Sequence, residues 1–411
     1  MKATVTRLWG WAVTHPILFV FLIALVARVV FALGVFVFHH GALFIDDAYF
    51  QRLAREMAIG RTQHWAPFDR PVYYATSTFL YPLTVLAWLI SPVLPGQLMV
   101  ATAGAGAAAL VTAIARHFLR ATWAIAAGLV MALLPSMVLW SSLTLKDGFV
   151  WCALAALGVV ACELDGPPVR FALVGAAGVV LLFFMDHLRD QTFVVAVWAL
   201  AVGLLVGAGR QWKQRAVYGV VVLLVLPAML GFGVGAERWI DDSIHGVVER
   251  REGNTIGANS AIVCAKTAND VGGLIRHLPC GFPAAVLRPY PWESGGSLGL
   301  DLARLEALFW YPLLVVAAVG LTRSWSARRW LAVPVLASLG SIVVYSSVEG
   351  NLGTAFRHRG EAVWGVALLA ALGGQSLADR WTRADARHHQ LTDEPTDDGA
   401  RAGNLLARHA R

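Results

Sequence analysis

Long apolar runs separated by short polar segments make up most of this chain. The first run, Pro16 to Phe38, is long enough to cross a bilayer as a helix, which takes about 20 residues. In order along the chain, the apolar runs are 16–38, 77–94, 97–115, 121–140, 148–162, 170–185, 191–209, 216–235, 304–322, 330–348 and 361–377. This pattern predicts an all-α polytopic membrane protein rather than several soluble domains.

The basic residues between the runs indicate how the chain threads the membrane, because cytoplasmic loops carry an excess of lysine and arginine. If every run crossed, three basic segments would face outside: Arg116 with Arg120, Arg210 with Lys213 and Arg215, and Arg323 with Arg328 and Arg329. If the run 77–94 stays in the interface, all three segments become cytoplasmic, as does the basic tail. We therefore predict about ten transmembrane helices in a plasma (inner) membrane, with both termini cytoplasmic.

The run 77–94 has the mixed composition of an interfacial or re-entrant helix. It contains Ser77, Thr78, Tyr81, Pro82 and Trp88. The segments then predicted to face outside are 39–96, 141–147, 186–190, 236–303 and 349–360. We expect residues 1–380 to form one transmembrane module, with interfacial helices in the outer loop 39–96 and a long outer loop at 236–303. Residues 381–411 have mixed charge and few apolar side chains, which predicts a disordered cytoplasmic tail.

Two adjacent carboxylates lie near the start of the first outer loop. Asp46 is placed to cap a helix from Asp47 to Ile59. The apolar residues of this helix recur at the spacing of a single helical face, and they are Phe50, Leu53, Ala54, Met57 and Ala58. The segment is therefore predicted to lie on the outer leaflet as an amphipathic helix. A cap uses one aspartate, so the second carboxylate is left for another role.

Composition agrees with a membrane protein and excludes some functions. Hydrophobic residues make up 57% of the 411 residues and charged residues 14%, against about 25% charged in soluble domains. The net charge of +7 serves first as a topology signal and a contact for anionic lipid. The sequence has no nucleic-acid-binding motif and no glycine-rich phosphate loop of a nucleotide-driven pump. The charge inside the first run, Arg28, is expected to face the bundle interior and to pair with a carboxylate or a lipid phosphate.

Four cysteines divide between two environments. Cys264 and Cys280 lie in the same long outer loop, where oxidising conditions allow a disulfide. Cys152 and Cys162 fall within a predicted helix. The sequence thus predicts a Cys264–Cys280 disulfide. Two free thiols remain the alternative, because spacing alone does not show the geometry of the pair.

Charged side chains that could carry chemistry collect near the outer ends of the predicted helices. They are Asp46 and Asp47, Lys146 and Asp147, Arg288, and the cluster of Arg357, His358 and Arg359. A carboxylate can take a proton from an attacking hydroxyl, while guanidinium groups hold a phosphate leaving group. Such a set on one face of the membrane suits a reaction on an anionic lipid substrate.

The amino-terminal part, about residues 12–165, resembles the GT-C glycosyltransferases. The similarity lies in a first helix followed by an outer Asp-Asp-x-Tyr segment at Asp46, Asp47 and Tyr49, an interfacial helix, and a second outer acidic position at Asp147. The members that it resembles use polyprenyl-phosphate sugars and are related to protein mannosyltransferases and the aminoarabinose lipid A transferase. The carboxyl half is similar only in general layout.

The resemblance implies roles for individual residues. Asp46 would be the base that activates the acceptor hydroxyl, and Asp47 its acidic neighbour. Asp147 would position the acceptor or a divalent cation, Mg or Mn, held with Asp46, although Lys146 beside it departs from a metal site. The basic cluster of Arg357, His358 and Arg359, together with Arg288, would bind the donor phosphate.

The implied activity is inverting transfer of a hexose or pentose from a polyprenyl-phosphate carrier on the extracytoplasmic face. The acceptor would be a cell-envelope glycan, lipid or protein, and no nucleic-acid partner is expected. A surface-polysaccharide polymerase or ligase that uses lipid-linked oligosaccharide is the alternative. A secondary transporter or flippase is a third hypothesis, which predicts carboxylates near the bilayer midplane and an internal repeat.

Simpler explanations exist for each candidate. Asp46 or Asp47 could serve only as a helix cap, and Asp147 could cap the helix that starts at Gly148 and pair with Lys146. The late arginines could contact lipid headgroups. A structural ion pair at Arg288 is as compatible with the sequence as a substrate contact.

Overall fold

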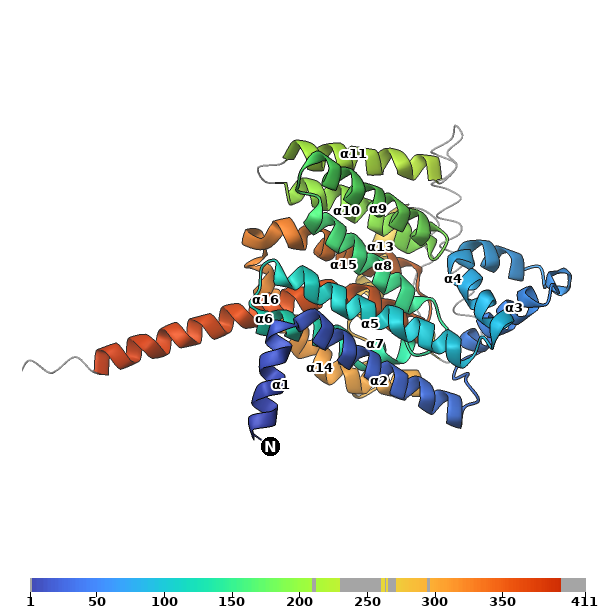
Figure 1. Cartoon of the computed structure of the whole chain (residues 1–411), viewed down its shortest axis with the longest axis horizontal. Coiled ribbons are helices and arrows are strands. Elements are labelled where there is room, and N and C mark those ends of the chain that lie inside the picture. Colours follow the sequence, from blue (N-terminus) through green and yellow to red (C-terminus); the bar gives the residue numbers. More distant parts are fainter. Residues whose placement is uncertain are drawn as a thin grey trace, which may run out of the picture.

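The computed structural model describes residues 2–208, 212–229, 260–262, 264, 271–293 and 296–392. These residues are helical almost throughout, and the long helices lie side by side in one bundle (Figure 1). The helices are α1 (Lys2–Thr14), α2 (Pro16–Phe38), α3 (Ile45–Ala58), η1 (Thr62–His64), α4 (Asp69–Leu89), α5 (Leu94–Arg116), α6 (Ala121–Leu133), α7 (Pro135–Trp140), α8 (Asp147–Glu163), α9 (Pro168–Asp186), α10 (Asp190–Val206), α11 (Trp212–Met229), α13 (Val271–Val286), α14 (Leu298–Leu321), η2 (Ser324–Ala327), α15 (Arg328–Val348) and α16 (Leu352–Thr392).

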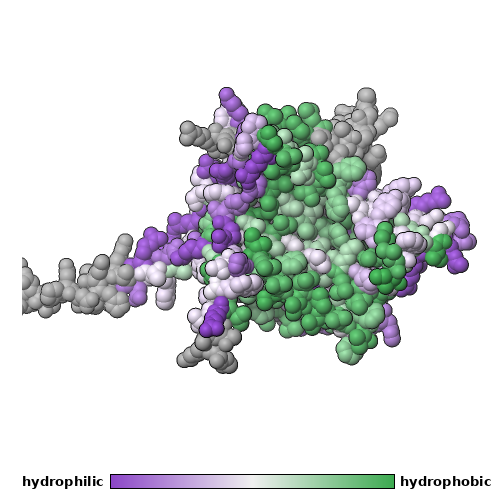
Figure 2. All heavy atoms as spheres, in the orientation of Figure 1, coloured by the Kyte–Doolittle hydropathy of each residue, from purple (hydrophilic) through white to green (hydrophobic). Residues whose placement is uncertain are grey.

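Several helices of the described residues have the length and apolar character of membrane spans. Six meet both criteria: α2, α5, α9, α14, α15 with η2, and α16. The helices α6 and α10 are apolar but shorter. Figure 2 shows a hydrophobic belt across the bundle, with hydrophilic residues gathered at its two ends. The predicted all-α class is confirmed, and these features are those of a multi-pass membrane protein.

The segment predicted as the first outer loop folds into α3, η1 and α4, which lie together at one end of the bundle (Figure 1). Most of the run 77–94 falls in α4, and α4 is not among the six helices of spanning character. Its backbone is non-helical at Thr76, where two helical pieces join. The placement of α4 beside α3, outside most of the apolar belt, agrees with an interfacial position for this run.

The start of α3 differs from the sequence prediction. The helix begins at Ile45 with Phe44 at its N-cap, so Asp46 does not cap it. The carboxylate of Asp47 instead accepts backbone hydrogen bonds from Leu43 at 2.8 Å and Phe44 at 3.0 Å. The side chain of Asp47, three residues after the N-cap, therefore satisfies exposed amide groups at the helix start.

The predicted apolar face of α3 is confirmed for its central residues, because Phe50, Leu53 and Ala54 are buried. Met57 is half-buried against the same core. The amphipathic pattern thus anchors α3 to the bundle and leaves Asp46 on its exposed side.

The described residues of the three basic segments, which leave out Arg210, gather at the end of the bundle opposite α3 and α4 (Figure 1). Asp165 binds Arg215, with Nη2 of the arginine 2.7 Å from Oδ2, and also pairs with Arg329. Arg120 pairs with Asp379 of α16. The loops grouped by the positive-inside argument thus lie on one side of the apolar belt.

A break between α6 and α7 explains the buried Arg28. Pro135 has no N–H to offer the carbonyl of Met131. The N–H of Ser136 donates to Glu306 at 2.6 Å, so the carbonyl of Ala132 also loses its helical partner. Arg28 donates to both freed carbonyls at 2.9 Å. It faces the interior, as predicted, but it binds these carbonyls and Ser141 instead of a carboxylate.

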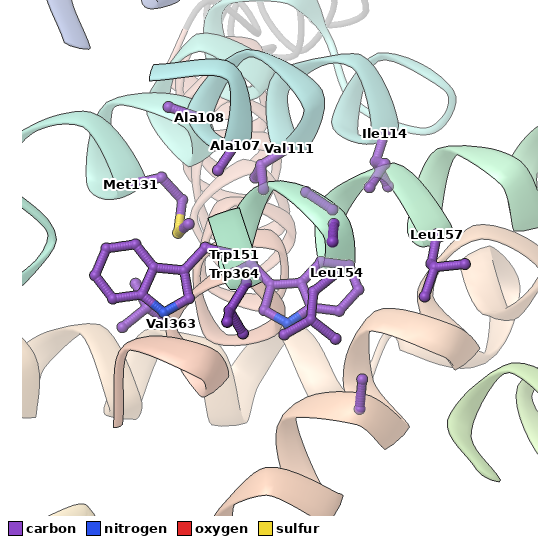
Figure 3. Packing of buried hydrophobic residues seen from close by; sticks show 14 of the residues in the cluster. Ala107, Ala108, Val111, Ile114, Met131, Trp151, Leu154, Leu157, Val363 and Trp364 are labelled. Atoms are coloured by element: carbon purple, nitrogen blue, oxygen red, sulfur yellow. The ribbon is translucent and has the colours of Figure 1, made fainter. Parts of the chain in front are cut away.

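Small residues let α8 approach α5 and α16 closely. The ring of Trp151 packs directly against Gly360, where an added Cβ would lie only 2.4 Å from the ring. Trp364 packs against Gly158 in the same way. Figure 3 shows these tryptophans among the side chains of the three helices. Such contacts fix the register of α16 against α8. They hold the first turns of α16 beside the start of α8.

The described part of the segment predicted as the long outer loop reaches the start of α16. The Cys264–Cys280 disulfide predicted from the sequence is formed. Ser260 and Ile262, close to that disulfide, exchange backbone hydrogen bonds with Leu352 and Gly350 at 3.0 and 2.7 Å. The disulfide therefore ties α13 to the segment that leads into α16. Residues 236–259, 263, 265–270 and 294–295 of the predicted loop lie outside the described residues.

Two predicted boundaries change. The segment 349–360 is not a loop, because α16 begins at Leu352 and carries Arg357, His358 and Arg359 on its first turns. The same helix continues to Thr392, beyond the start of the predicted tail at 381. Only residues 393–411 of that tail lie outside the described residues.

Replacing Cys264 with serine is expected to destabilise the protein by about 3 kcal/mol, because the disulfide closes a loop of about 15 residues in the unfolded chain. Thermal unfolding in detergent measures the loss. Cys152→Ser is the control, since Cys152 is a free cysteine elsewhere in the bundle. Equal melting temperatures for the Cys264→Ser variant and the wild type would show that the disulfide does not hold this region.

Candidate functional site

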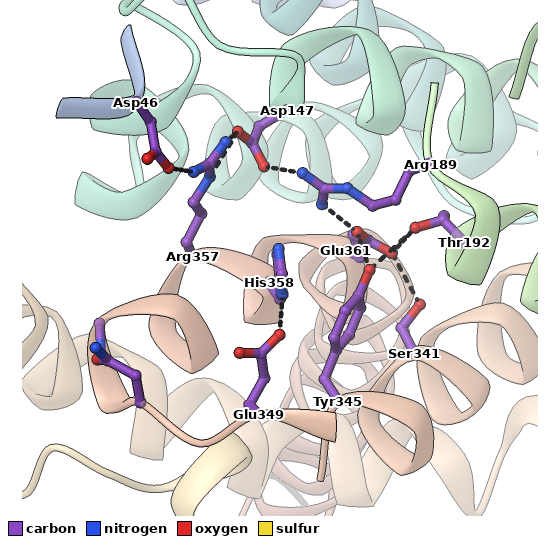
Figure 4. Close-up of polar contacts among 12 residues, drawn as sticks. Asp46, Asp147, Arg189, Thr192, Ser341, Tyr345, Glu349, Arg357, His358 and Glu361 are labelled. Atoms are coloured by element: carbon purple, nitrogen blue, oxygen red, sulfur yellow. Dashed lines mark hydrogen bonds and ion pairs between the residues drawn. The ribbon is translucent and has the colours of Figure 1, made fainter. Parts of the chain in front are cut away.

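Arg357, on the second turn of α16, joins the two acidic positions that the sequence singled out. Its Nη1 donates to Oδ2 of Asp46 at 2.7 Å. Its Nε and Nη2 lie 2.8 and 2.6 Å from Oδ2 of Asp147. Figure 4 shows the guanidinium group between the two carboxylates. Segments that are 311 and 210 residues from Arg357 in sequence therefore meet at one end of the bundle.

The two carboxylates differ in environment. The side chain of Asp46 is 62% exposed, whereas that of Asp147 is fully buried. Asp147 is buried at the start of α8 and uses both oxygens on arginines. Asp46 is therefore the carboxylate that a substrate from outside can reach, and Asp147 holds the arginine in place.

The ion pairs continue from Asp147 into the bundle. Arg189 donates to Oδ1 of Asp147 at 2.8 Å and to Glu361 at 2.6 Å. Thr192 and Tyr345 also donate to Glu361, each at 2.8 Å. Acidic and basic side chains alternate along this network of ion pairs, so each of these buried charges has a partner of opposite sign (Figure 4).

Lys146 lies next to this network at the N-cap of α8. Burial and the neighbouring guanidinium groups of Arg189 and Arg357 lower the pKa of Lys146 to about 7. The alternative in which Lys146 pairs with Asp147 is not what the structure shows, because Arg189 and Arg357 take both oxygens of that carboxylate. Lys146 adds a cation whose charge changes near neutral pH.

Arg359 points to a different part of the bundle from Arg357. It stacks over the rings of Trp310 and Phe356 at 5.3 and 5.0 Å. Its Nη1 donates to the carbonyl of Val286 at 3.1 Å, and Nη2 lies 3.7 Å from Glu306. Two residues apart on a helix, the two arginines cannot share one face. Arg359 is thus separate from the Asp46 carboxylate.

The remaining basic candidates have partners of their own. Nδ1 of His358 lies 2.5 Å from Glu349. Arg288 donates to Glu293 at 2.7 Å, which is the structural ion pair considered as its alternative. The ion pairs of His358 and Arg288 are thus with Glu349 and Glu293, and not with Asp46 or Asp147.

Asp47 is turned away from the site. It is buried, and besides Leu43 and Phe44 its carboxylate accepts from the backbone N–H of Ala48 at 2.9 Å. Burial raises the pKa of Asp47, and these hydrogen bonds oppose that shift. Its role is to fix the start of α3 and thereby the position of Asp46.

The arrangement does not suit a divalent cation between Asp46 and Asp147. The guanidinium group of Arg357 already occupies that place and neutralises both carboxylates. Within the described ranges, no three side chains of His, Cys, Asp or Glu come together as a metal-binding group.

Sequence reasoning missed Arg189 and Glu361. Arg189 lies in the short segment 186–190, which the sequence predicts to face outside, and an arginine on that side would run against the usual charge bias. Glu361 begins the apolar run 361–377, where an ionisable group is costly unless paired or functional. Both signals were present in the sequence, but neither identifies the partner.

The site therefore consists of an exposed carboxylate on α3, an arginine on α16 that holds it, and a buried network behind that arginine. Comparison with known proteins adds no relative, since no family model matches the chain and the search of curated proteins found no match.

Proposed function

We propose that this protein transfers a sugar, with inversion at the anomeric carbon, from a polyprenyl-phosphate carrier to a cell-envelope glycan, lipid or protein. The proposal includes a GT-C-like architecture with ten spanning helices, both termini in the cytoplasm and the site outside. The observation that carries it is the contact of Arg357 with Asp46, an exposed base and an anion-binding group at one end of the apolar belt. The sequence resemblance of residues 12–165 supports the same reading.

The reaction needs few groups. Asp46 accepts the proton of the acceptor hydroxyl, and the hydroxyl oxygen forms a bond to the anomeric carbon. The bond from that carbon to the phosphate oxygen breaks, and its electron pair leaves with the polyprenyl phosphate. Arg357 neutralises the leaving phosphate, because a guanidinium group matches phosphate geometry and keeps its charge.

The resting geometry implies an order of events. Asp46 and Arg357 are in contact, so no sugar ring fits between them until the contact opens. Nη1 is the nitrogen of Arg357 on the exposed carboxylate, whereas Nε and Nη2 stay on buried Asp147. A donor phosphate would replace Asp46 on Nη1. This exchange would free the carboxylate to act as a base only once the donor is bound.

Buried charges inside an apolar bundle also occur in transporters, which favours a secondary transporter as the second candidate. The chain of Asp147, Arg189 and Glu361 leads from the exposed end of the network into the bundle. A transporter would accumulate solute in vesicles without breaking a covalent bond. A glycosyltransferase would release free polyprenyl phosphate, so the two candidates give different products.

Purified protein, incubated with a panel of polyprenyl-phosphate-linked hexoses and pentoses, is expected to release polyprenyl phosphate. Arg357→Lys should raise the KM for the donor about tenfold or more, because lysine keeps the charge but loses the bidentate geometry. This variant keeps a cation beside Asp147, which Arg357→Ala would not.

Arg304→Lys is the matched control, since Arg304 is a partly exposed arginine (33%) paired with Asp301 at 3.2 Å. Its donor KM should equal that of the wild type. No release of polyprenyl phosphate from any donor, or an unchanged KM in Arg357→Lys, would refute the proposed function.

A further inference from the structure

A cavity of about 630 Å³ opens beside α3, η1 and α4, in the region that projects from the apolar belt. Its volume falls in the range of small-molecule sites. Its wall is aromatic and polar: Trp65, Tyr73, Tyr74 and Tyr81 provide rings, and Gln63 and Arg70 provide hydrogen-bond donors. The reaction proposed for Asp46 and Arg357 uses none of these residues.

The aromatic rings present both faces and polar edges. Trp65 and Tyr73 have centroids 5.6 Å apart and a tilt of 51°, and Tyr73 meets Tyr81 edge-on at 5.9 Å. The hydroxyl groups of Tyr73 and Tyr81 lie 2.5 Å apart and form a hydrogen bond. Tyr74 and Tyr81 are 68% and 55% exposed. Two rings of the cluster are thus open to a ligand.

One polar group in the wall lacks a partner. The indole nitrogen of Trp65 is buried and makes no hydrogen bond with any other described residue. Buried indole N–H groups usually find an acceptor.

A scaffold of hydrogen bonds keeps the cavity walls together. Asp69 at the start of α4 accepts from Tyr49 at 2.7 Å and Arg52 at 2.9 Å, both on α3, and from the N–H of Ala66 at 2.9 Å. Burial alone would raise the pKa of Asp69, but these hydrogen bonds lower it below its ordinary value. The carboxylate therefore remains charged and joins α3, the η1 loop and α4.

We propose that this cavity binds pyranose rings of a glycan, which, if the proposed function holds, is the acceptor of the transfer reaction. A sugar ring has C–H faces that pack on aromatic faces and hydroxyl edges that need donors and acceptors, which is the mixture that this wall offers. Met57 lines the cavity eleven residues beyond Asp46 on α3, which places it roughly 16 Å from the base along the helix axis. The cavity would hold units of the glycan remote from the reacting hydroxyl.

A hydrocarbon chain fits a different place. A larger cavity of about 910 Å³ lies between α6, α14 and α16, and its wall is almost wholly apolar side chains, among them Leu133, Phe309 and Leu313. The aromatic cavity differs in having tyrosine hydroxyls, an amide and a guanidinium group. Its chemistry favours a hydroxyl-rich ligand over a lipid tail.

Binding of gluco-, manno- and galacto-oligosaccharides of one to six units, measured with the full chain in nanodiscs, tests the proposal. At least one series should bind the wild type. Tyr74→Ala combined with Tyr81→Ala should weaken that binding about tenfold or more, because two ring contacts are lost. Both side chains are exposed, so the double variant should keep the wild-type melting temperature. Trp88→Ala is the matched control, an aromatic on the same helix that is 71% exposed and outside the cavity wall.

Asp46→Asn should bind the glycan like the wild type, since Asp46 does not line the cavity. Glycan binding without any transfer activity would therefore reject the proposed function and leave this inference standing. No binding of any series, or equal binding by the double variant, would overturn the inference. So would a phospholipid that native mass spectrometry finds on the wild type and not on the double variant, because the cavity would then be a lipid site.

Discussion

Replacing Asp46 with asparagine is expected to abolish sugar transfer while leaving the protein folded. Asparagine cannot take the proton of the acceptor hydroxyl, and loss of a general base typically lowers a rate by ~10²–10⁴-fold. The side chain is 62% exposed, and Arg357 keeps its second carboxylate, Asp147. The free energy of unfolding should therefore change by no more than about 0.5 kcal/mol.

Release of polyprenyl phosphate and the melting temperature, measured on the same preparation, check both parts of this expectation. Asp301→Asn is the control, because Asp301 is an exposed aspartate (57%) paired with Arg304. It should retain full turnover. Turnover at the wild-type rate in Asp46→Asn would remove the proposed base.

Replacing Asp147 with asparagine is expected to destabilise the protein by about 3–5 kcal/mol, the cost of breaking a buried ion pair. Arg357 and Arg189 would each lose a charged partner in a site that is almost closed to water. Turnover per folded molecule should also fall, because Arg357 would no longer be held where the donor phosphate arrives.

The opposite end of the bundle offers a matched comparison. Asp165 is also nearly buried and also binds two arginines, Arg215 and Arg329. Asp165→Asn should lower the melting temperature like Asp147→Asn but keep wild-type turnover per folded molecule. If both variants lost turnover equally, Asp147 would have only a structural role.

Much of the fold follows from the apolar pattern. The predicted run 16–38 has the same bounds as α2. The prediction that 77–94 does not span put the three basic segments on one side of the membrane, and the structure places their described residues at one end of the bundle. The boundaries that failed were set by contacts the pattern does not contain. Phe44 rather than Asp46 became the N-cap of α3 because Asp47 reaches back to the backbone.

The positions of the site residues could be predicted from the apolar pattern, but their contacts could not. Sequence placed Asp46, Asp147 and Arg357 near the same end, because each follows or begins an apolar run. It did not show that Arg357 would bind both carboxylates, since that depends on how α16 packs against α8. Glycines at this packing, such as Gly360 against Trp151, determine which face of α16 meets Asp147. Arg359, two residues further on, faces away for the same reason.

A cryo-EM map of the protein with polyprenyl phosphate bound tests the central claim most directly. The phosphate should lie on Nη1 of Arg357, with the carboxylate of Asp46 released from that nitrogen and Asp147 still paired. A phosphate beside Arg215 and Arg329, at the other end of the bundle, would contradict the account.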